Sequence, residues 1–136
     1  MITALGTNVL LDILVPNEDF FESSRRALED CWAAGSLVIC DVVYAEISIH
    51  FSAQADCDAF FLETGIRIEP LEREAAFFAG RAWRTYRKRG GTRSRILPDF
   101  LIGAHATKQA SQLLARDRGF YGQLFPALKI LDPRTR

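Results

Sequence analysis

Residues 2–14 read ITALGTNVLLDIL and set a pattern that the rest of the chain follows. The first four of these residues form a short apolar run, which is typical of a buried strand. The pair Thr7-Asn8 can cap the helix that the following valine and leucine residues predict. Gly6 therefore lies at the carboxyl end of the first predicted strand. A strand followed at once by a helix is typical of an α/β fold.

The alternation of strand and helix continues to the end of the sequence. This alternation predicts a single α/β/α sandwich with a short, mainly parallel, five-stranded sheet. Strands are predicted near residues 2–5, 37–40, 66–69, 112–115 and 129–131. Helices are predicted near residues 7–14, 19–34, 42–53, 55–64, 73–89 and 98–108.

Length and composition predict one domain, residues 1–136, around one core. The chain has 136 residues, of which 49% are hydrophobic, and that is enough to form such a core. No apolar run reaches membrane-spanning length, and the four residues between Met1 and Gly6 leave no room for a signal peptide. We therefore expect a cytoplasmic protein. The three cysteines, Cys31, Cys40 and Cys57, form no C-x-x-C pair, so we expect reduced, buried thiols rather than disulfides or a zinc site.

Three acidic residues are spread along the chain at positions where a common cleft is expected. Glu46 falls in the first turns of a predicted helix, and Asp99 follows Pro98, a residue favoured at the first position of a helix. Asp117 follows the strand predicted at residues 112–115. Sites in open parallel sheets form beyond the carboxyl ends of strands, where the strand order reverses. Each acid taken alone is explained as well by the favourable dipole at a helix N-terminus or by a surface charge.

Net charge does not point to nucleic acid, because 17 basic residues balance 17 acidic ones. The local distribution is more informative, since seven basic residues fall between positions 81 and 95. Such a cluster can hold phosphates beside an acidic cleft. A solvated helix face with cations at its C-terminus is an equally good interpretation. The cluster consists of Arg81, Arg84, Arg87, Lys88, Arg89, Arg93 and Arg95.

Four segments together resemble the successive motifs of PIN-domain ribonucleases, specifically the VapC-type toxins of bacterial toxin–antitoxin systems. These segments are TNVLLD at 7–12, VYAEI at 43–47, LPDFLIGAHA at 97–106 and LARDRGFY at 114–121. Their order and spacing match, and the resemblance extends to Asp132-Pro133. It implies a PIN domain that cuts RNA as an endoribonuclease, forms a homodimer and is held by a cognate antitoxin.

The resemblance also implies a metal site for Mg²⁺ or Mn²⁺. Asp99 and the position of Gly6 would be its principal ligands, with Glu46 and Asp117 completing it directly or through water. Carboxylate oxygens suit Mg²⁺, and converging carboxylates repel one another unless a cation is present. RNA phosphates would be held by the basic cluster, in particular by Arg87, Lys88, Arg89, Arg93 and Arg95.

Gly6 departs from the family pattern, which has an aspartate directly before Thr7-Asn8. A glycine offers only its backbone carbonyl, so we expect this chain to be inactive or severely impaired as a nuclease. Asp12 is not expected to substitute, because it lies about 9 Å further along the helix. The other acids are present, which favours a selected or deliberate change over gradual decay. Ala115, where relatives often have threonine or serine, is a smaller departure.

A second function remains open, in which the chain is a non-catalytic PIN-fold module that binds RNA or an antitoxin. A nucleotide-binding protein is less favoured, because the sequence has neither a G-x-G-x-x-G nor a G-x-x-x-x-G-K-[ST] motif. Two histidines are read as structural rather than as ligands: His105 as a packed, hydrogen-bonded residue, and His50 as a contact on a helix surface.

Overall fold

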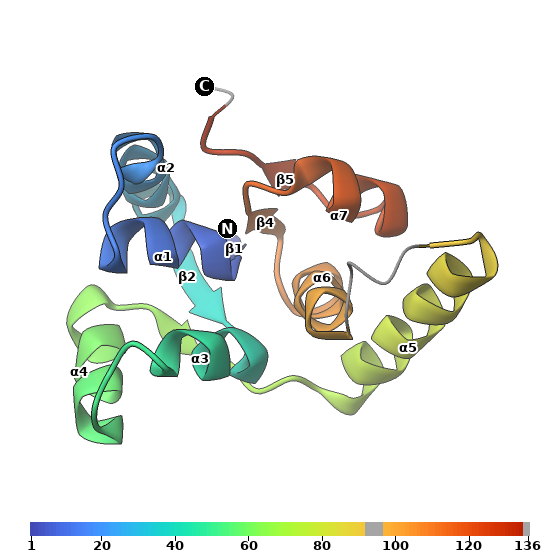
Figure 1. Ribbon diagram of the computed structural model, residues 1–136, viewed down its shortest axis with the longest axis horizontal. Coiled ribbons are helices and arrows are strands. Elements are labelled where there is room, and N and C mark those ends of the chain that lie inside the picture. The colour runs from blue at the N-terminus through green and yellow to red at the C-terminus, as the bar shows by residue number, and fades with distance from the viewer. Residues whose placement is uncertain (92–96, 135–136) are drawn as a thin grey trace.

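The structure is a computed structural model and describes residues 1–91 and 97–134. Along the chain, one or two helices separate each strand from the next (Figure 1). The strands are β1 (Ile2–Leu5), β2 (Ser36–Ile39), β3 (Arg67–Ile68), β4 (Gln112–Leu114) and β5 (Ile130–Leu131). The helices are α1 (Thr7–Leu14), α2 (Phe21–Ala34), α3 (Asp41–Ser48), α4 (Gln54–Thr64), α5 (Arg73–Lys88), α6 (Leu97–Gln109) and α7 (Arg118–Leu124).

One five-stranded sheet holds the molecule together, in the order β3-β2-β1-β4-β5. Every neighbouring pair is parallel, with Thr3 of β1 opposite Leu37 on one side and Gln112 on the other. The strand order runs one way from β1 to β3 and the other way from β1 to β5. The reversal therefore lies between β1 and β4, where a parallel sheet leaves a crevice beyond its strand ends. The predicted fold class is confirmed.

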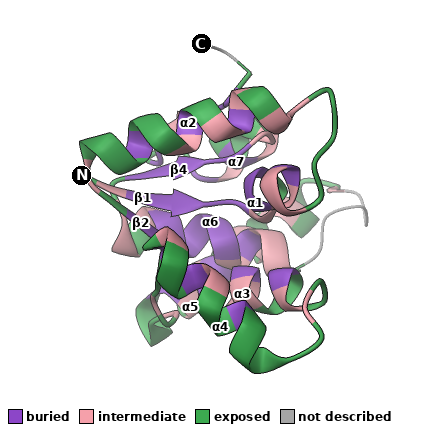
Figure 2. Cartoon of the chain, turned by 90° about the vertical axis from the view of Figure 1, so that its left-hand side faces the viewer, coloured by how far each residue is buried: buried purple, intermediate pink, exposed green. Residues whose placement is uncertain are grey.

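Helices cover the sheet on both faces (Figure 2). In that view α2 lies on one side of the strands, while α6 lies on the other. Helix α6 is the core helix of the molecule, because a continuous stretch from Ile102 to Ala106 is buried. Gly103 within this stretch allows the Phe125 ring to pack against the helix, since an added Cβ would lie 2.3 Å from the ring carbon Cε2. Helix α5 packs along α6 on its outer side.

Several elements differ from the sequence-based expectations, three of them clearly. Helix α2 begins at Phe21 rather than near residue 19, because the Asn17 side-chain oxygen accepts a hydrogen bond from the Phe20 N–H (2.8 Å) and forms a local turn. Helix α3 ends at Ser48 instead of continuing to residue 53. Helix α7 was not predicted, because two glycines within its seven residues weaken the helical pattern.

The three cysteines are free and buried, with at most 5% of their surface exposed. Their burial in the core is as expected. Burial raises the pKa of the Cys31 and Cys40 thiols, which keeps them protonated. None of the helices in the described part of the chain is both long and apolar enough to cross a membrane.

Candidate functional site

A pocket of about 520 Å³ lies at the reversal of strand order. Gly6, which follows β1, and Ala115, which follows β4, both contribute to its wall. Glu46 enters from α3 and Asp99 from α6, so the fold brings together three of the four positions predicted for the site. The wall consists of Gly6, Thr7, Asn8, Leu11, Ala45, Glu46, Ile49, His50, Asp99, Ile102, Ala115 and Tyr121.

The backbone at Gly6 does not require a glycine. Its φ of −77° and ψ of 152° are extended values that any residue adopts. The Gly6 N–H donates a 2.9 Å hydrogen bond to the carbonyl oxygen of Leu114, which fixes the end of β1 beside β4. A Cβ added at position 6 would lie 3.1 Å from Cβ of Ala115. A side chain therefore fits at this position with a shift of a few tenths of an ångström.

Thr7 binds Glu46 instead of capping its own helix. Its hydroxyl Oγ1 donates a 2.6 Å hydrogen bond to Oε1 of Glu46. Helix α1 begins at Thr7 with Gly6 in the cap position, and no side-chain cap bond forms there in the described structure. The predicted cap by Thr7-Asn8 is therefore wrong. Sequence spacing gave no sign of a pairing between residues 39 positions apart.

Asp99 and Asp117 are placed differently. Asp99 is half-buried in the first turn of α6 and lies in the pocket wall. Asp117 is half-buried at the N-cap position of α7, two residues beyond Ala115, and is not among the described residues of that wall. Its carbonyl oxygen accepts a hydrogen bond from the Tyr121 N–H (3.3 Å). Asp117 thus lies next to the pocket rather than in it.

The residues present do not make a complete site for a divalent cation. Of the described residues in the wall, Glu46 and Asp99 carry carboxylates, and Gly6 adds no side-chain oxygen. Across residues 1–91 and 97–134, no three His, Cys, Asp or Glu side chains form a group that could hold a metal ion. Mg²⁺ is usually held by one or two carboxylates together with substrate phosphates and waters. Glu46 and Asp99 meet that number, but Gly6, at the position that the resemblance gives to a principal ligand, adds no side-chain oxygen.

A larger hollow of about 910 Å³ lies elsewhere, between α2, β5 and α7. It contains none of Gly6, Glu46 or Asp99. Size alone does not make a reactive site, whereas the smaller pocket brings carboxylates to the ends of the two central strands. We therefore take the smaller pocket as the candidate functional site.

The sequence compares well with one protein family, because a sequence profile of the PIN domain matches residues 4–122. The chain belongs to the PIN domain family. The match runs from Ala4 in β1 to Gly122 in α7 and includes all described residues of the pocket wall. No curated protein is similar enough to this PIN domain to count as a match.

Several solved structures share the fold of this PIN domain. One is a chain of VapBC2 from Rickettsia felis, in a structure with a DNA fragment from the VapBC2 promoter. It is 20% identical to this chain with a TM-score of 0.73, and the alignment covers 97% of this chain and 98% of that one. A chain of VapBC-1 from nontypeable Haemophilus influenzae is 16% identical with a TM-score of 0.73 and 98% coverage of both chains. A chain of FitAcB from Neisseria gonorrhoeae is 20% identical with a TM-score of 0.69 and complete coverage of both. These likenesses show a common fold over essentially the whole chain.

The two histidines of the PIN domain have different surroundings. His50 is exposed and lies in the pocket wall beside Glu46, in the turn after α3 rather than on the longer helix that was predicted. His105 is 1% exposed, and its Nε2 lies 3.9 Å from Oε1 of Glu69. Within the described structure that nitrogen has no hydrogen-bond partner. His105 is therefore packed as expected, and Nε2 is its one ring nitrogen without a partner in the described structure.

The predicted phosphate-binding residues are described in part. Arg87, Lys88 and Arg89 are exposed at the C-terminal end of α5, and the Arg87 guanidinium lies over the Trp83 ring, 5.4 Å from its centroid. Arg93 and Arg95 lie outside the described residues. Cations at the last turn of a helix are also favoured by its dipole, so their position agrees with either interpretation of the cluster.

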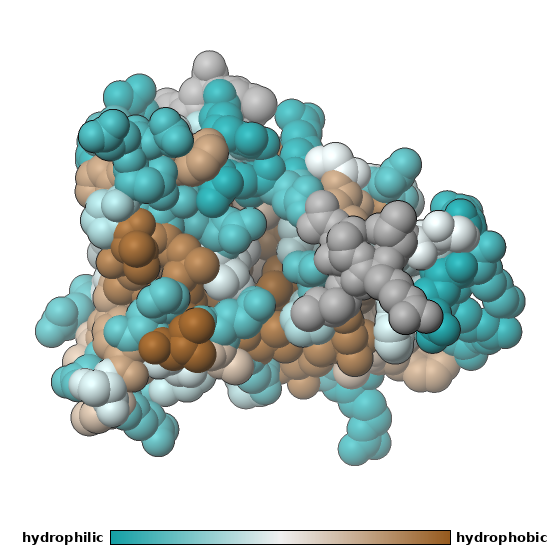
Figure 3. Space-filling model, in the orientation of Figure 1, coloured by the Kyte–Doolittle hydropathy of each residue, from teal (hydrophilic) through white to brown (hydrophobic). Residues whose placement is uncertain are grey.

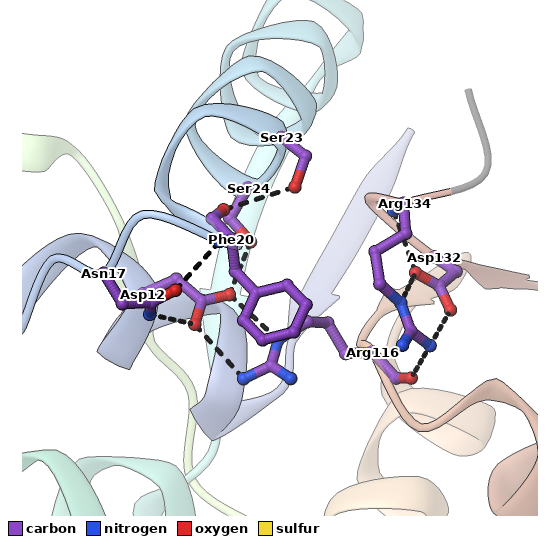
Figure 4. Close-up of polar contacts among 8 residues, drawn as sticks. All are labelled: Asp12, Asn17, Phe20, Ser23, Ser24, Arg116, Asp132 and Arg134. Atoms are coloured by element: carbon purple, nitrogen blue, oxygen red, sulfur yellow. Dashed lines mark hydrogen bonds and ion pairs between the residues drawn. The ribbon is translucent and has the colours of Figure 1, made fainter.

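Asp12 has a role that the sequence did not reveal. It is 2% exposed and forms a two-bond ion pair with Arg116, with a Ser24 hydroxyl donating to the same carboxylate (Figure 4). The Asp12 carboxylate is thus paired inside the protein and is not among the described residues of the pocket wall. The pairing joins residues 104 positions apart, so no local sequence pattern could have indicated it.

Proposed function

We propose that this chain is a VapC-type toxin whose PIN domain is built as a metal-dependent endoribonuclease and whose catalytic site lacks one carboxylate at Gly6. Membership of the PIN domain family supports the nuclease class. The fold shared with the chains of VapBC and FitAB complexes supports the toxin assignment. The observation that carries the proposal is the pocket at the reversal of strand order, where Glu46 and Asp99 flank the empty side-chain position of Gly6.

The residues that line the pocket are better suited to binding than to catalysis. Glu46 accepts a hydrogen bond from the hydroxyl of Thr7, and Asp99 lies in the first turn of α6. Without a side-chain oxygen at position 6, we expect Glu46 and Asp99 to hold Mg²⁺ or Mn²⁺ more weakly than a complete site does. In a complete site the ion would lower the pKa of a bound water and stabilise charge on the phosphoryl oxygens. We therefore expect severely impaired RNA cleavage from the chain with Gly6.

An antitoxin partner is part of the proposal. A similar structure from Klebsiella pneumoniae is a toxin–antitoxin complex by name, and the pocket of this chain has an apolar border. Val15 and Ile49 are 53% and 79% exposed, and hydrophobic side chains gather over α1 and α3 on the face that Figure 3 shows. Exposed apolar surface beside a functional pocket suits a protein interface. The proposal also includes a homodimer and an RNA substrate, and both rest on the same relationship to the PIN domain family.

The alternative is a non-catalytic PIN module that binds RNA or an antitoxin. The same observation at Gly6 favours it, because a binding module has no need of the missing carboxylate. The two proposals differ in what happens when that carboxylate is restored. An enzyme with one missing ligand regains cleavage in the Gly6→Asp variant, whereas a binding module does not.

The test is RNA cleavage in Mg²⁺ or Mn²⁺ by three purified proteins: the chain as it stands, Gly6→Asp, and Gly6→Asp with Asp99→Asn. Activity confined to the Gly6→Asp variant supports the nuclease. Absence of cleavage in all three folded proteins on total cellular RNA overturns it in favour of the binding module. The Asp99→Asn change also guards against a contaminating ribonuclease, because a contaminant would be unaffected by it.

A further inference from the structure

The residue before Asp117 is anchored through its side chain. Arg116 donates from Nε to Oδ2 of Asp12 (3.0 Å) and from one terminal nitrogen to Oδ1 (3.1 Å), so the guanidinium faces the carboxylate through two parallel bonds. Its guanidinium carbon also lies 4.0 Å from the centroid of the Phe20 ring. Asp12 belongs to α1 and Phe20 to the segment before α2, so the end of β4 is tied to both (Figure 4).

The same residue is anchored through its main chain. The Arg116 carbonyl oxygen accepts a 2.7 Å hydrogen bond from a terminal nitrogen of Arg134. Arg134 is oriented in turn by Asp132, which accepts from its main-chain N–H (2.9 Å) and from its guanidinium. The Asp132 carboxylate is 4% exposed, and the guanidinium of Arg134 holds its pKa below the ordinary value.

The backbone around these anchors is fixed as well. Leu114 accepts from the Gly6 N–H, Ala115 donates to Leu131 (3.0 Å), and Asp117 accepts from the Tyr121 N–H. Every residue from 114 to 117 thus has at least one main-chain group bound to another element or to the next helix. The two bonds from side chains, at Arg116 and Arg134, are the part of this arrangement that a substitution can remove.

Stability alone does not explain why ionised groups perform this task. Burying a carboxylate such as Asp12 costs desolvation energy, and apolar residues of similar size often stabilise a fold as well or better. The planar fork of an arginine fixes orientation, because its two bonds to a carboxylate permit one geometry. Both arginines act at the position directly before Asp117: Arg116 through its own side chain, and Arg134 through a bond to the Arg116 carbonyl oxygen.

We propose that Asp12 and Arg134, acting through Arg116, are positioning residues that fix the Asp117 carboxylate beside the pocket of Glu46 and Asp99. The inference rests on the proposed function, in which Asp117 takes part in the catalytic site. Asp12 in this arrangement contributes to the site without touching substrate.

Amide hydrogen exchange tests the anchoring without any activity. In the chain as it stands, Arg116→Ala and Arg134→Ala should speed exchange of the amides of residues 115–121 by roughly 10-fold or more, since each removes one anchor. Arg26→Ala, which changes an exposed arginine of α2, is the matched control and should leave this segment unchanged. Exchange that is equally slow in all four proteins overturns the proposal.

Cleavage in the Gly6→Asp background tests the positioning. Arg134→Ala should lower kcat by roughly 10- to 100-fold, the usual range for groups that orient a ligand. Arg116→Lys, which keeps the charge but not the fork, should retain part of the activity lost in Arg116→Ala. After Asp117→Asn, Arg134→Ala should cost nothing further, whereas a purely structural role would lower activity again.

The outcomes separate the two proposals. A Gly6→Asp parent that is inert means that the proposed function fails, and the positioning of a catalytic carboxylate fails with it, whatever the exchange shows. An active parent in which Arg134→Ala and Arg116→Ala cleave at full rate overturns the positioning inference alone. Thermal unfolding of each variant shows which proteins are folded at the assay temperature. We expect Arg134→Ala to remain folded, because this side chain is half-exposed and lies outside the hydrophobic core.

Discussion

The Thr7 hydroxyl lies 2.6 Å from Oε1 of Glu46 and donates a hydrogen bond that joins the first turn of α1 to α3. Both residues line the pocket, so the bond sets where the Glu46 carboxylate points. Thr7, two residues beyond the end of β1, therefore lines the pocket as well as being the first residue of α1.

Replacing Thr7 with valine should impair a restored site. In the Gly6→Asp background, Thr7→Val keeps the shape of the side chain but removes the hydrogen-bond donor. Loss of a group that orients a ligand commonly lowers metal affinity or activity by ~10- to 100-fold. We expect a loss of cleavage in that range, measured as kcat on a defined RNA. Thr7→Ser retains the hydroxyl and is the matched control. Equal rates for the valine and serine variants would show that the bond is dispensable.

Mg²⁺ should stabilise the Gly6→Asp variant but not the chain with Gly6. The added carboxylate lies near Glu46 and Asp99, and like charges in one pocket raise the free energy of the folded state until a cation binds. Binding to the folded state alone adds ~2.7 kcal/mol at a concentration 100 times Kd. Thermal unfolding with and without Mg²⁺, followed by chelation, measures this.

The Gly6→Asn variant is the control for that measurement. It places a side chain of the same shape at position 6, 3.1 Å from the Ala115 Cβ, and so carries the same steric cost without the charge. A similar response to Mg²⁺ in the asparagine variant would mean that the ion binds somewhere else.

Hydrophobic periodicity was enough to predict the sheet. Strands such as Ile2–Leu5 are apolar and bounded by helical patterns, and the alternation requires parallel crossovers. The same pattern placed Gly6, Glu46 and Asp99 at one end of the sheet, where the pocket is found. Local patterns thus carry the information needed for the core and for residues at strand ends.

Side-chain pairing between distant segments was not predictable. The bonds from Thr7 to Glu46 and from Arg116 to Asp12 depend on how the chain turns after each element, which periodicity does not specify. The helix at Arg118–Leu124 was missed for a related reason, because tertiary packing of Tyr121 outweighs the poor helix propensity of its glycines.

Acidification below pH 6.5 should destabilise the fold through His105. Burial lowers its pKa, although the nearby carboxylates of Glu69, Asp41 and Glu72 act in the opposite direction. The unfolded chain therefore takes up a proton at a higher pH than the folded one. The free energy of unfolding should fall as pH drops from 6.5 toward the lowered pKa, by at most about 1.4 kcal/mol per pH unit. Urea unfolding between about pH 5.5 and 7.5 measures this.

The His105→Gln variant isolates that contribution. It keeps a polar side chain of similar size but does not titrate, so its stability should depend less on pH in the same range. A pH dependence identical to that of the parent would assign the effect to other groups.

Adding a methyl group to Gly103 should destabilise the core. The Cβ would lie 2.3 Å from ring carbon Cε2 of Phe125, so the ring or α6 must move. Overpacking of this kind typically costs about 1–3 kcal/mol. Gly80→Ala on α5 is the matched control, because nothing lies within 4 Å of its added Cβ and alanine favours helix by about 0.5–1 kcal/mol. Denaturant unfolding should shift in opposite directions for the two variants.

Neutralising the end of α5 should weaken RNA binding in a salt-dependent way. The chain with Gly6 is suited to this measurement, because we expect it to bind RNA without cutting it. If Arg87, Lys88 and Arg89 bind phosphates, changing all three to glutamine reduces the slope of log affinity against log salt by about 0.7 for each phosphate that is no longer bound.

The control for this binding measurement removes the same charge from other places. Arg26, Arg67 and Arg73 are exposed on α2, β3 and the start of α5, and their replacement by glutamine changes net charge equally. Equal slopes for the two triple variants would show that overall charge alone attracts RNA. A slope that is smaller in the variant at residues 87–89 but unchanged in the control would assign phosphate binding to the end of α5, because counterion release depends on where phosphates are bound.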